Sequence, residues 1–370
     1  MRTIIRRILI ATILTSGFAF AQPPLILKTR QIDTTMSQPV MEIRSPHAQG
    51  RGHLLLQFNE APSAEVLADL KFRGVSVLQD VPQNGLLVSL EGRADLNGLG
   101  IRYAAPIAPS DKISPLIGAL NSAAMNGFFL VEFHPDVDMN EARQMVLSSG
   151  IDLHENPDLN PQHLMIQADN SSTLASLASL DAVGYIFPAS RELIRGSRTL
   201  ACLGALTTTG TTAQSIPTYG DGWDGPGLGS AALTYVWSKM TAQLPSASVQ
   251  AEIQRAMAEW SKAVQVTWTQ GTNPTGDRTV NILWATYDHG DGFPFTGPGG
   301  VLAHTFYPAP PNPEPIAGDM HLNDSETWKI GSDIDVFSVT LHELGHALGL
   351  GHSDDPSAVM YPYYKMATQL

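Results

Sequence analysis

The chain has 370 residues, of which 35 are acidic and 22 are basic, and its formal net charge is −13. An acidic excess of this size argues against nucleic acid or an anionic membrane surface as a partner. Hydrophobic residues make up 43% of the chain and charged residues 15%. Most of the chain should therefore fold, into roughly two or three domains.

The first residues have the order of an export signal. Three arginines among the first seven residues precede an apolar run from Ile8 to Phe20, and Ala19-Phe20-Ala21 fits a small-x-small cleavage site. The alternative is a buried N-terminal helix. We expect residues 1–21 to be a signal peptide. The mature chain is then expected to be a monomer that is extracellular or periplasmic, with no membrane insertion after cleavage.

Residues 22–50 are mixed and polar, and we expect a tether there. Two weakly similar copies follow, in residues 51–112 and 126–193. Each copy predicts a strand, a helix closed by Gly74 or Gly150, two further strands, a short second helix and a final strand. This order predicts two β-α-β-β-α-β units of the ferredoxin-like type.

The double unit resembles the subtilisin-propeptide type of prosequence that precedes secreted proteases. The resemblance rests on pattern alone, and implies a chaperone or an inhibitor of the downstream domain. Spacer or adhesion modules are the alternative. We expect the histidines of these units to be surface or core residues and not ligands: His53, His134, His154 and His163. Residues 194–222 are rich in Gly, Ser and Thr, which predicts an exposed linker.

A third unit, of α+β class, is expected over residues 223–370. Its segments Leu233–Trp237 and "VNILWA" predict strands, and "LPSASVQAEIQRAMAEWSKAV" predicts an amphipathic helix capped by Ser246 or Ser248. A second helix should begin near Asp335 and run through "VFSVTLHELGHALG".

That second helix contains the first part of the stretch "HELGHALGLGH". His342 and His346 are four residues apart, so both imidazoles lie on one helical face and can reach one zinc ion. Gly349 lets the chain turn, so that His352 can return as a third ligand. Glu343 is then placed to accept a proton from a water activated by the metal. A fourth coordination position left open is typical of a catalytic site.

The full pattern H-E-x-x-H-x-x-G-x-x-H is the metzincin signature, and Met360, eight residues past His352, completes it as a Met-turn. From about Trp223 onward the chain resembles the matrixins, the matrix-metalloproteinase branch of the metzincins, in a secreted bacterial style. The resemblance implies a twisted mixed sheet with an active-site helix. It also implies a zinc endopeptidase that acts on polypeptides.

The resemblance implies further metal ligands. A structural zinc would be bound by His289, Asp291, His304 and His321, which is a chemically sensible tetrahedral set. One calcium would be bound by Thr296, the carbonyls of Gly297, Gly299 and Val301, Asn323 and Glu326, and Asp319 would serve a second calcium. The family usually has aspartate where this chain has Thr296 and Asn323, so we expect weakened calcium binding.

The resemblance also places the substrate. It would pair with an edge strand around Leu302 and Ala303, and Tyr361 to Tyr364, including Pro362, would form one side of a pocket. The family's final helix is expected to be missing, because the sequence ends ten residues past Met360.

Cys202 is the single cysteine, so an intramolecular disulfide is excluded. As a candidate latency thiol for the catalytic zinc it lacks the family's flanking residues, and a small buried apolar side chain is the alternative. Two other functions remain open at this point. In one, the chain is a metal-stabilised binding protein without turnover. In the other, the N-terminal units are the functional part and inhibit a protease.

Overall fold

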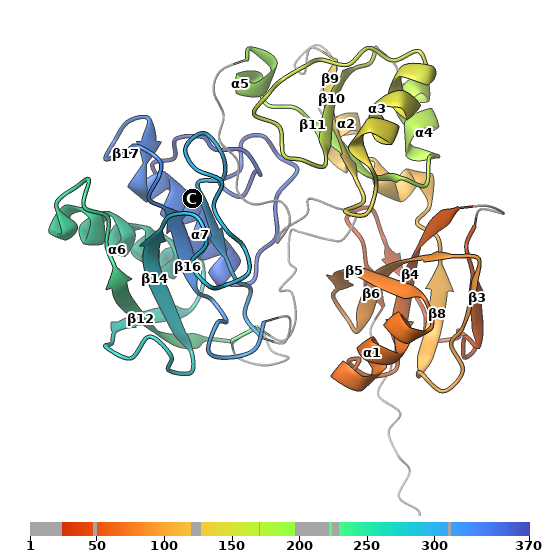
Figure 1. The fold of residues 1–370 in the computed structure, drawn as a ribbon, viewed down its shortest axis with the longest axis horizontal. Coiled ribbons are helices and arrows are strands. Elements are labelled where there is room, and N and C mark those ends of the chain that lie inside the picture. The colour runs from red at the N-terminus through yellow and green to blue at the C-terminus, as the bar shows by residue number, and fades with distance from the viewer. Residues whose placement is uncertain are drawn as a thin grey trace, which may run out of the picture.

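The computed structural model describes residues 24–46, 50–119, 127–169, 171–196, 222–223, 229–309 and 312–370. The expected signal peptide, Cys202 and most of the expected linker lie outside these residues. Figure 1 shows two small α/β units, coloured red to orange and yellow to light green, beside a larger C-terminal domain coloured green to blue. The class is α+β, as expected.

Residues 22–50, expected as a tether, are instead packed where the structure describes them. β1 (Leu25–Ile26) pairs with β2 (Gln31–Ile32), and β3 (Glu42–Arg44) pairs with β7 (Arg93–Asp95). Leu25 and Leu27 are at most 3% exposed and lie in one apolar cluster with Leu55 and Leu87. This segment therefore belongs to the fold of the first unit.

The first unit has an antiparallel four-stranded sheet in the order β5-β6-β4-β8. Its elements are β4 (Arg51–Phe58), α1 (Ala64–Phe72), β5 (Val75–Val81), β6 (Gly85–Glu91) and β8 (Ile101–Ala105). The expected second helix is absent, and β7 stands in its place. Gly92, Gly98 and Gly100 all have positive φ there, a backbone conformation that cannot continue a helix.

The second unit has the second helix that the first unit lacks, and it has fewer residues in strands. After η1 (Pro109–Lys112) and α2 (Pro115–Ala119) come β9 (Phe128–Phe133), α3 (Met139–Ser148), β10 (His163–Gln167), α4 (Ser171–Ala178), β11 (Val183–Pro188) and α5 (Arg191–Ile194). The sheet order is β10-β9-β11, all antiparallel. The strand expected after Gly150 is reduced to one bridge between Leu153 and Ile166.

The sheet of the second unit is buried on both faces. Successive residues of a strand point to opposite faces. Val131 and Ile166 pack in the cluster that holds residues of α3 and α4. Leu130, Met165, Tyr185 and Phe187 face the other way and pack against Tyr361 and Tyr363 of the C-terminal domain. The sheet of the second unit therefore lies between the helices of that unit and the C-terminal domain.

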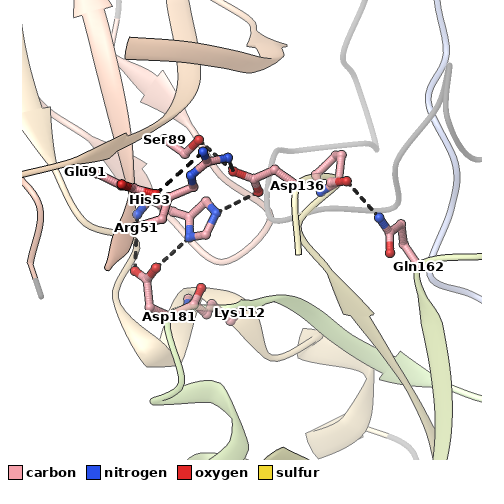
Figure 2. Close-up of polar contacts among 9 residues, drawn as sticks. Arg51, His53, Ser89, Glu91, Lys112, Asp136, Gln162 and Asp181 are labelled. Atoms are coloured by element: carbon pink, nitrogen blue, oxygen red, sulfur yellow. Dashed lines mark hydrogen bonds and ion pairs between the residues drawn. The ribbon is translucent and has the colours of Figure 1, made fainter. Parts of the chain in front are cut away.

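A buried polar cluster joins the two N-terminal units (Figure 2). His53 of β4 lies between two carboxylates of the second unit, with Nε2 2.9 Å from Asp136 Oδ1 and Nδ1 2.5 Å from Asp181 Oδ2. Arg51 and Ser89 also donate hydrogen bonds to Asp136. The ring of His134 stacks on that of His53, with centroids 4.0 Å apart.

The C-terminal domain has a five-stranded sheet in the order β13-β12-β14-β16-β15, in which only the edge strand β15 is antiparallel. Its elements are β12 (Ala231–Lys239), α6 (Ser246–Ala263), β13 (Val266–Gln270), β14 (Thr279–Ala285), β15 (Ala303–Thr305), β16 (Met320–Asn323), β17 (Trp328–Lys329), β18 (Ile334–Asp335) and α7 (Val336–Ala347). The N-cap of α6 is Pro245, without a side-chain cap, so neither Ser246 nor Ser248 caps it as predicted. Both serines lie inside the first turn.

The second predicted helix is α7, and it begins as expected. Asp335 is its N-cap, and its carboxylate accepts a hydrogen bond from the Ser338 amide. α7 packs against α6, where Trp260 Nε1 donates to the Leu341 carbonyl. In the part of the chain that the structure describes, no helix is both long enough and apolar enough to cross a bilayer.

Candidate active site and metal centres

α7 brings two of the predicted zinc ligands together. The Nε2 atoms of His342 and His346 are 3.0 Å apart, and two ligands of one tetrahedral zinc lie about 3.3 Å apart. The Nδ1 atoms bond the carbonyls of Val359 and Leu350, at 2.8 and 2.7 Å. Because each Nδ1–H donates to a carbonyl, each Nε2 keeps the lone pair that a metal needs.

His352 completes this cluster from outside the helix. Gly349, with φ of 96°, reverses the chain after α7. The ring of His352 then lies 5.3 Å from that of His342 and 4.9 Å from that of His346, centroid to centroid. One ligand atom from each of the three lies within 4.8 Å of the others. Their donor set fits one zinc ion.

The three imidazoles are kept neutral by their surroundings. Burial lowers the pKa of His342 to about 4. Burial also lowers the pKa values of His346 and His352 well below their ordinary range. A neutral imidazole is the form that binds a metal.

Met360, the predicted Met-turn residue, packs against helix α7 at Gly345. The Ser353 amide donates to the Met360 carbonyl at 2.8 Å, which closes the loop after His352. A Cβ atom at Gly345 would lie 2.3 Å from Met360 Sδ and 3.0 Å from Trp260 Cζ2. Gly345 is therefore the residue that lets helix α7 approach Met360.

Glu343 lies beside the histidine cluster at the edge of a pocket. It is 1% exposed, and its Oε2 accepts a 2.7 Å hydrogen bond from Thr305 Oγ1 of the edge strand β15. The pocket is lined by Leu302, Ser338, Val339, His342, Glu343, Ala358, Val359, Tyr361, Pro362, Tyr363, Tyr364, Lys365 and Ala367. Three of the four predicted substrate residues line it, namely Leu302, Pro362 and Tyr364. Ala303 is fully buried next to it.

The predicted structural zinc ligands form a second cluster. Asp291 Oδ2 lies 2.7 Å from His304 Nε2, 2.7 Å from His321 Nδ1 and 2.9 Å from His289 Nε2. His321 Nδ1 is 3.1 Å from His289 Nε2 and 3.2 Å from His304 Nε2. All four donor atoms thus converge on one point, which fits a closed tetrahedral zinc site.

The charges in this second cluster suit a metal. Burial acts to raise the pKa of Asp291, but hydrogen bonds from His321, the Phe293 amide and His304 hold it well below its usual range. Burial lowers the pKa of His304 to about 4. The cluster therefore combines one ionised carboxylate with three imidazoles, of which His304 prefers to be neutral.

The predicted calcium loop is held by its own hydrogen bonds. Asn323 Nδ2 donates to the carbonyls of Gly297 and Val301, at 3.1 and 2.9 Å, and Ser325 N fixes its Oδ1. Glu326 Oε1 accepts from the Gly299 amide at 2.5 Å. An amide NH₂ thus bridges two carbonyls that would be calcium ligands, and this arrangement fits a cation poorly.

Asp319 does not join the residues of that loop. Its Oδ1 accepts a hydrogen bond from the Asn281 amide at 2.9 Å, and it lies near Glu314. Burial raises the pKa of Asp319 to about 8. Its expected role in a second calcium site, together with nearby carbonyls, stays a prediction.

Some residues of the site were not found by sequence analysis. Thr305 was missed because a threonine in a short strand has no signal of its own, although it directly follows a predicted zinc ligand. Asp354 was also missed, and it accepts hydrogen bonds from Ser114 and Tyr185 of the N-terminal part. Among the described residues, the two groups with metal-ligand geometry contain none of the four N-terminal histidines.

Comparison with known proteins agrees with the geometry of the C-terminal domain. Residues 228–370 match the family model described as Matrixin, and residues 26–108 match a family described as a domain of unknown function. The C-terminal segment is similar to matrix metalloproteinase-20 and neutrophil collagenase of Homo sapiens, both 42% identical over 134 and 133 residues. Karilysin of Tannerella forsythia is 41% identical over 133 residues.

Each of these matches covers 36% of this chain, and 26%, 27% and 28% of the respective relatives. The chain therefore spans about a quarter of the length of the relatives it matches.

Proposed function

We propose that this chain, whose residues 228–370 are a matrixin domain, is a zinc-dependent endopeptidase that is exported from the cell. One observation carries the proposal. Three neutral imidazoles converge beside a buried glutamate at the edge of a pocket. A binding module has no need of a carboxylate at that position, whereas hydrolysis of a peptide bond requires a general base.

His342, His346 and His352 would bind the catalytic zinc. When bound there, zinc would supply a Lewis acid that polarises the scissile carbonyl and makes a water molecule more acidic. Glu343 accepts the proton of the attacking water and then passes it to the nitrogen of the leaving amine. The Thr305 hydroxyl, which bonds Glu343 Oε2, holds the carboxylate in place for both transfers.

A polypeptide substrate would lie along β15. This strand is the edge of the sheet and pairs with β16 on one side only. Its other side offers backbone groups to an extended chain. The side chain after the scissile bond would enter the pocket between α7 and Tyr361 to Tyr364.

Asp291 and the three histidines of its cluster would bind a second zinc with a structural role. That cluster is closed by four protein ligands, so no position remains for substrate. Calcium is not part of the proposal, because Asn323 already bridges the carbonyls of the expected loop.

The rival function is a metal-stabilised binding protein without turnover. Incubation of the purified chain with casein, with and without 1,10-phenanthroline as zinc chelator, separates the two. We expect cleavage that the chelator abolishes and that added zinc restores. A zinc-loaded chain that leaves casein and a mixed peptide library intact would instead support the binding protein.

A further inference from the structure

The pocket and the second N-terminal unit share one stretch of chain, residues 358–365, here called the wall segment. Its residues Val359, Tyr361, Pro362 and Tyr363 line the pocket beside His342. Among the described residues, none that precedes Leu302 lines this pocket. The N-terminal units therefore lie behind the wall segment and do not fill the pocket.

Side chains of the wall segment are held from two sides. Tyr364 points to the start of α7, where its hydroxyl donates to the Asp333 carbonyl and accepts from the Asp335 amide. Tyr361 and Tyr363 lie in the apolar cluster formed by the open face of the second unit's sheet. Each is 2% exposed.

Both of these tyrosines end in hydrogen bonds to the second unit. The Tyr361 hydroxyl donates to the Pro188 carbonyl at 2.9 Å and accepts from the Ser190 amide at 3.2 Å. These partners stand where β11 ends and α5 begins, so the hydroxyl is fixed by backbone groups of a regular element.

Tyr363 is fixed through a buried chain of polar groups. Its hydroxyl is 2.7 Å from His163 Nδ1 and accepts from the Asn160 amide at 3.1 Å. His163 Nε2 lies 3.1 Å from Glu132 Oε2. Glu132 and His163 face each other across β9 and β10. The position of Tyr363 is therefore set by the sheet of the second unit.

A second attachment lies next to the third zinc ligand. Asp354, two residues past His352, has one carboxylate oxygen that accepts from Ser114 Oγ at 2.6 Å and from Tyr185 OH at 2.8 Å. The ammonium group of Lys28 lies 4.2 Å from the centre of the Tyr185 ring. The loop from His352 to Tyr363 is thus tied to the N-terminal part at both ends.

We infer that the second N-terminal unit is a lasting part of the active-site framework. It positions the wall segment through Tyr361 and Tyr363, and so determines which substrate side chain the pocket accepts. The second unit then stabilises the active enzyme. It is not an inhibitory segment that must be removed from the pocket. The kinetic half of this inference rests on the proposed peptidase function, whereas the structural half does not.

The structural half is tested by hydrogen–deuterium exchange of the full chain with zinc present. His163→Phe deletes the imidazole that bonds the Tyr363 hydroxyl, and so changes the partner in the second unit. Tyr363→Phe deletes the hydroxyl itself, and so changes the partner in the wall segment. His154→Phe is the matched control, because His154 lies in the same unit and its ring contact is with Phe128. Exchange in residues 358–365 should rise about 10-fold in both variants and stay unchanged in the control.

Two readouts keep a folding defect of the C-terminal domain apart from this result. All six tryptophans lie beyond residue 222, so tryptophan fluorescence reports the C-terminal domain, and exchange in α7 should stay at the wild-type rate. Unchanged exchange in residues 358–365 of both variants would overturn the inference, whatever the activity.

The kinetic half uses a peptide series that differs only in the residue after the scissile bond. For both variants, the ratio of kcat/KM between large and small residues should change about 10-fold, mainly through KM. A preference identical to wild type in both variants would contradict a role in specificity. If the wild-type chain cleaves none of these peptides, the peptidase proposal fails, and the exchange experiment still decides the structural half.

Discussion

The Thr305 hydroxyl donates a 2.7 Å hydrogen bond to Glu343 Oε2, linking the edge strand to the carboxylate beside the histidine cluster. This contact is fully buried, and it joins two residues with separate tasks in the proposed mechanism. β15 would hold the substrate, and Glu343 would move the proton. The position of the proposed base is therefore coupled to the strand along which the peptide would lie.

Thr305→Val tests this coupling, because valine keeps the shape of the side chain and lacks the donor. We expect kcat to fall about 10-fold, as a hydrogen bond to a charged group contributes about 1.5 kcal/mol or more. Zinc content should stay the same. Thr305→Ser keeps the hydroxyl and should retain most of the rate, and a valine variant as fast as wild type would show that Glu343 needs no such partner.

The His53 cluster predicts a pH dependence of stability (Figure 2). Burial lowers the pKa of His53, but hydrogen bonds to Asp136 and Asp181 raise it more, so its folded value lies above the ordinary 6.5. The stabilisation by His53 is complete below pH 6.5 and is lost as the pH rises through the folded pKa. Arg51, Lys112, His134 and Glu91 are the other titratable groups of this cluster.

The measurement is urea unfolding of wild type and His53→Gln, followed by far-UV circular dichroism at pH 6 and pH 9. At pH 6 the variant should be about 3 kcal/mol less stable, because two carboxylates lose a buried partner. At pH 9 the difference should be smaller. His154→Gln serves as the control, and a difference that grows with pH would contradict the assignment.

The Asp291 cluster predicts a structural metal ion. Asp291→Asn keeps the size of the side chain and removes the negative charge that contacts all three imidazoles. We expect one zinc per chain instead of two, and a loss of stability above about 3 kcal/mol. Asp288→Asn, whose Oδ1 only accepts from the Gly290 amide, should change neither zinc content nor melting temperature.

The loop around Asn323 predicts little response to calcium. In wild type, millimolar calcium should hardly change the melting temperature. In Asn323→Asp the carboxylate would face the carbonyls of Gly297 and Val301. This variant should lose about 2 kcal/mol without calcium and regain it with calcium. Asn273→Asp, on an exposed turn, is the control. A larger calcium-induced rise in melting temperature in wild type than in Asn323→Asp would contradict this interpretation.

The active-site helix and its histidine cluster could be predicted from the sequence because the ligands follow a fixed spacing. His342 and His346 are set by the helical repeat, and Asp335 is a strong N-cap. The second cluster required the family resemblance, since His289 and His321 come from different segments, a loop and β16.

Other features depend on contacts that no local pattern records. Leu25 and Leu27 looked like part of a tether because their packing partners, such as Leu87, are distant in sequence. A short second helix was predicted for each copy, but in the first unit three glycines favour a turn and β7 at that place. The run "VGYIFP" of β11 is buried at every residue. Such a run indicates a sheet that is buried on both faces. It does not predict that Tyr361 and Tyr363 are the residues that pack on the second face.

The central claim is that Glu343 is the base beside a catalytic zinc, and the most direct test is Glu343→Gln with zinc content and peptidase rate measured on one sample. Glutamine can still accept the hydrogen bond from Thr305 but cannot take up a proton. We predict two zinc ions per chain, as in wild type, and a rate at least about 1000-fold lower, while Glu252→Gln on α6 keeps full activity. Peptidase activity near the wild-type level in Glu343→Gln would contradict the account.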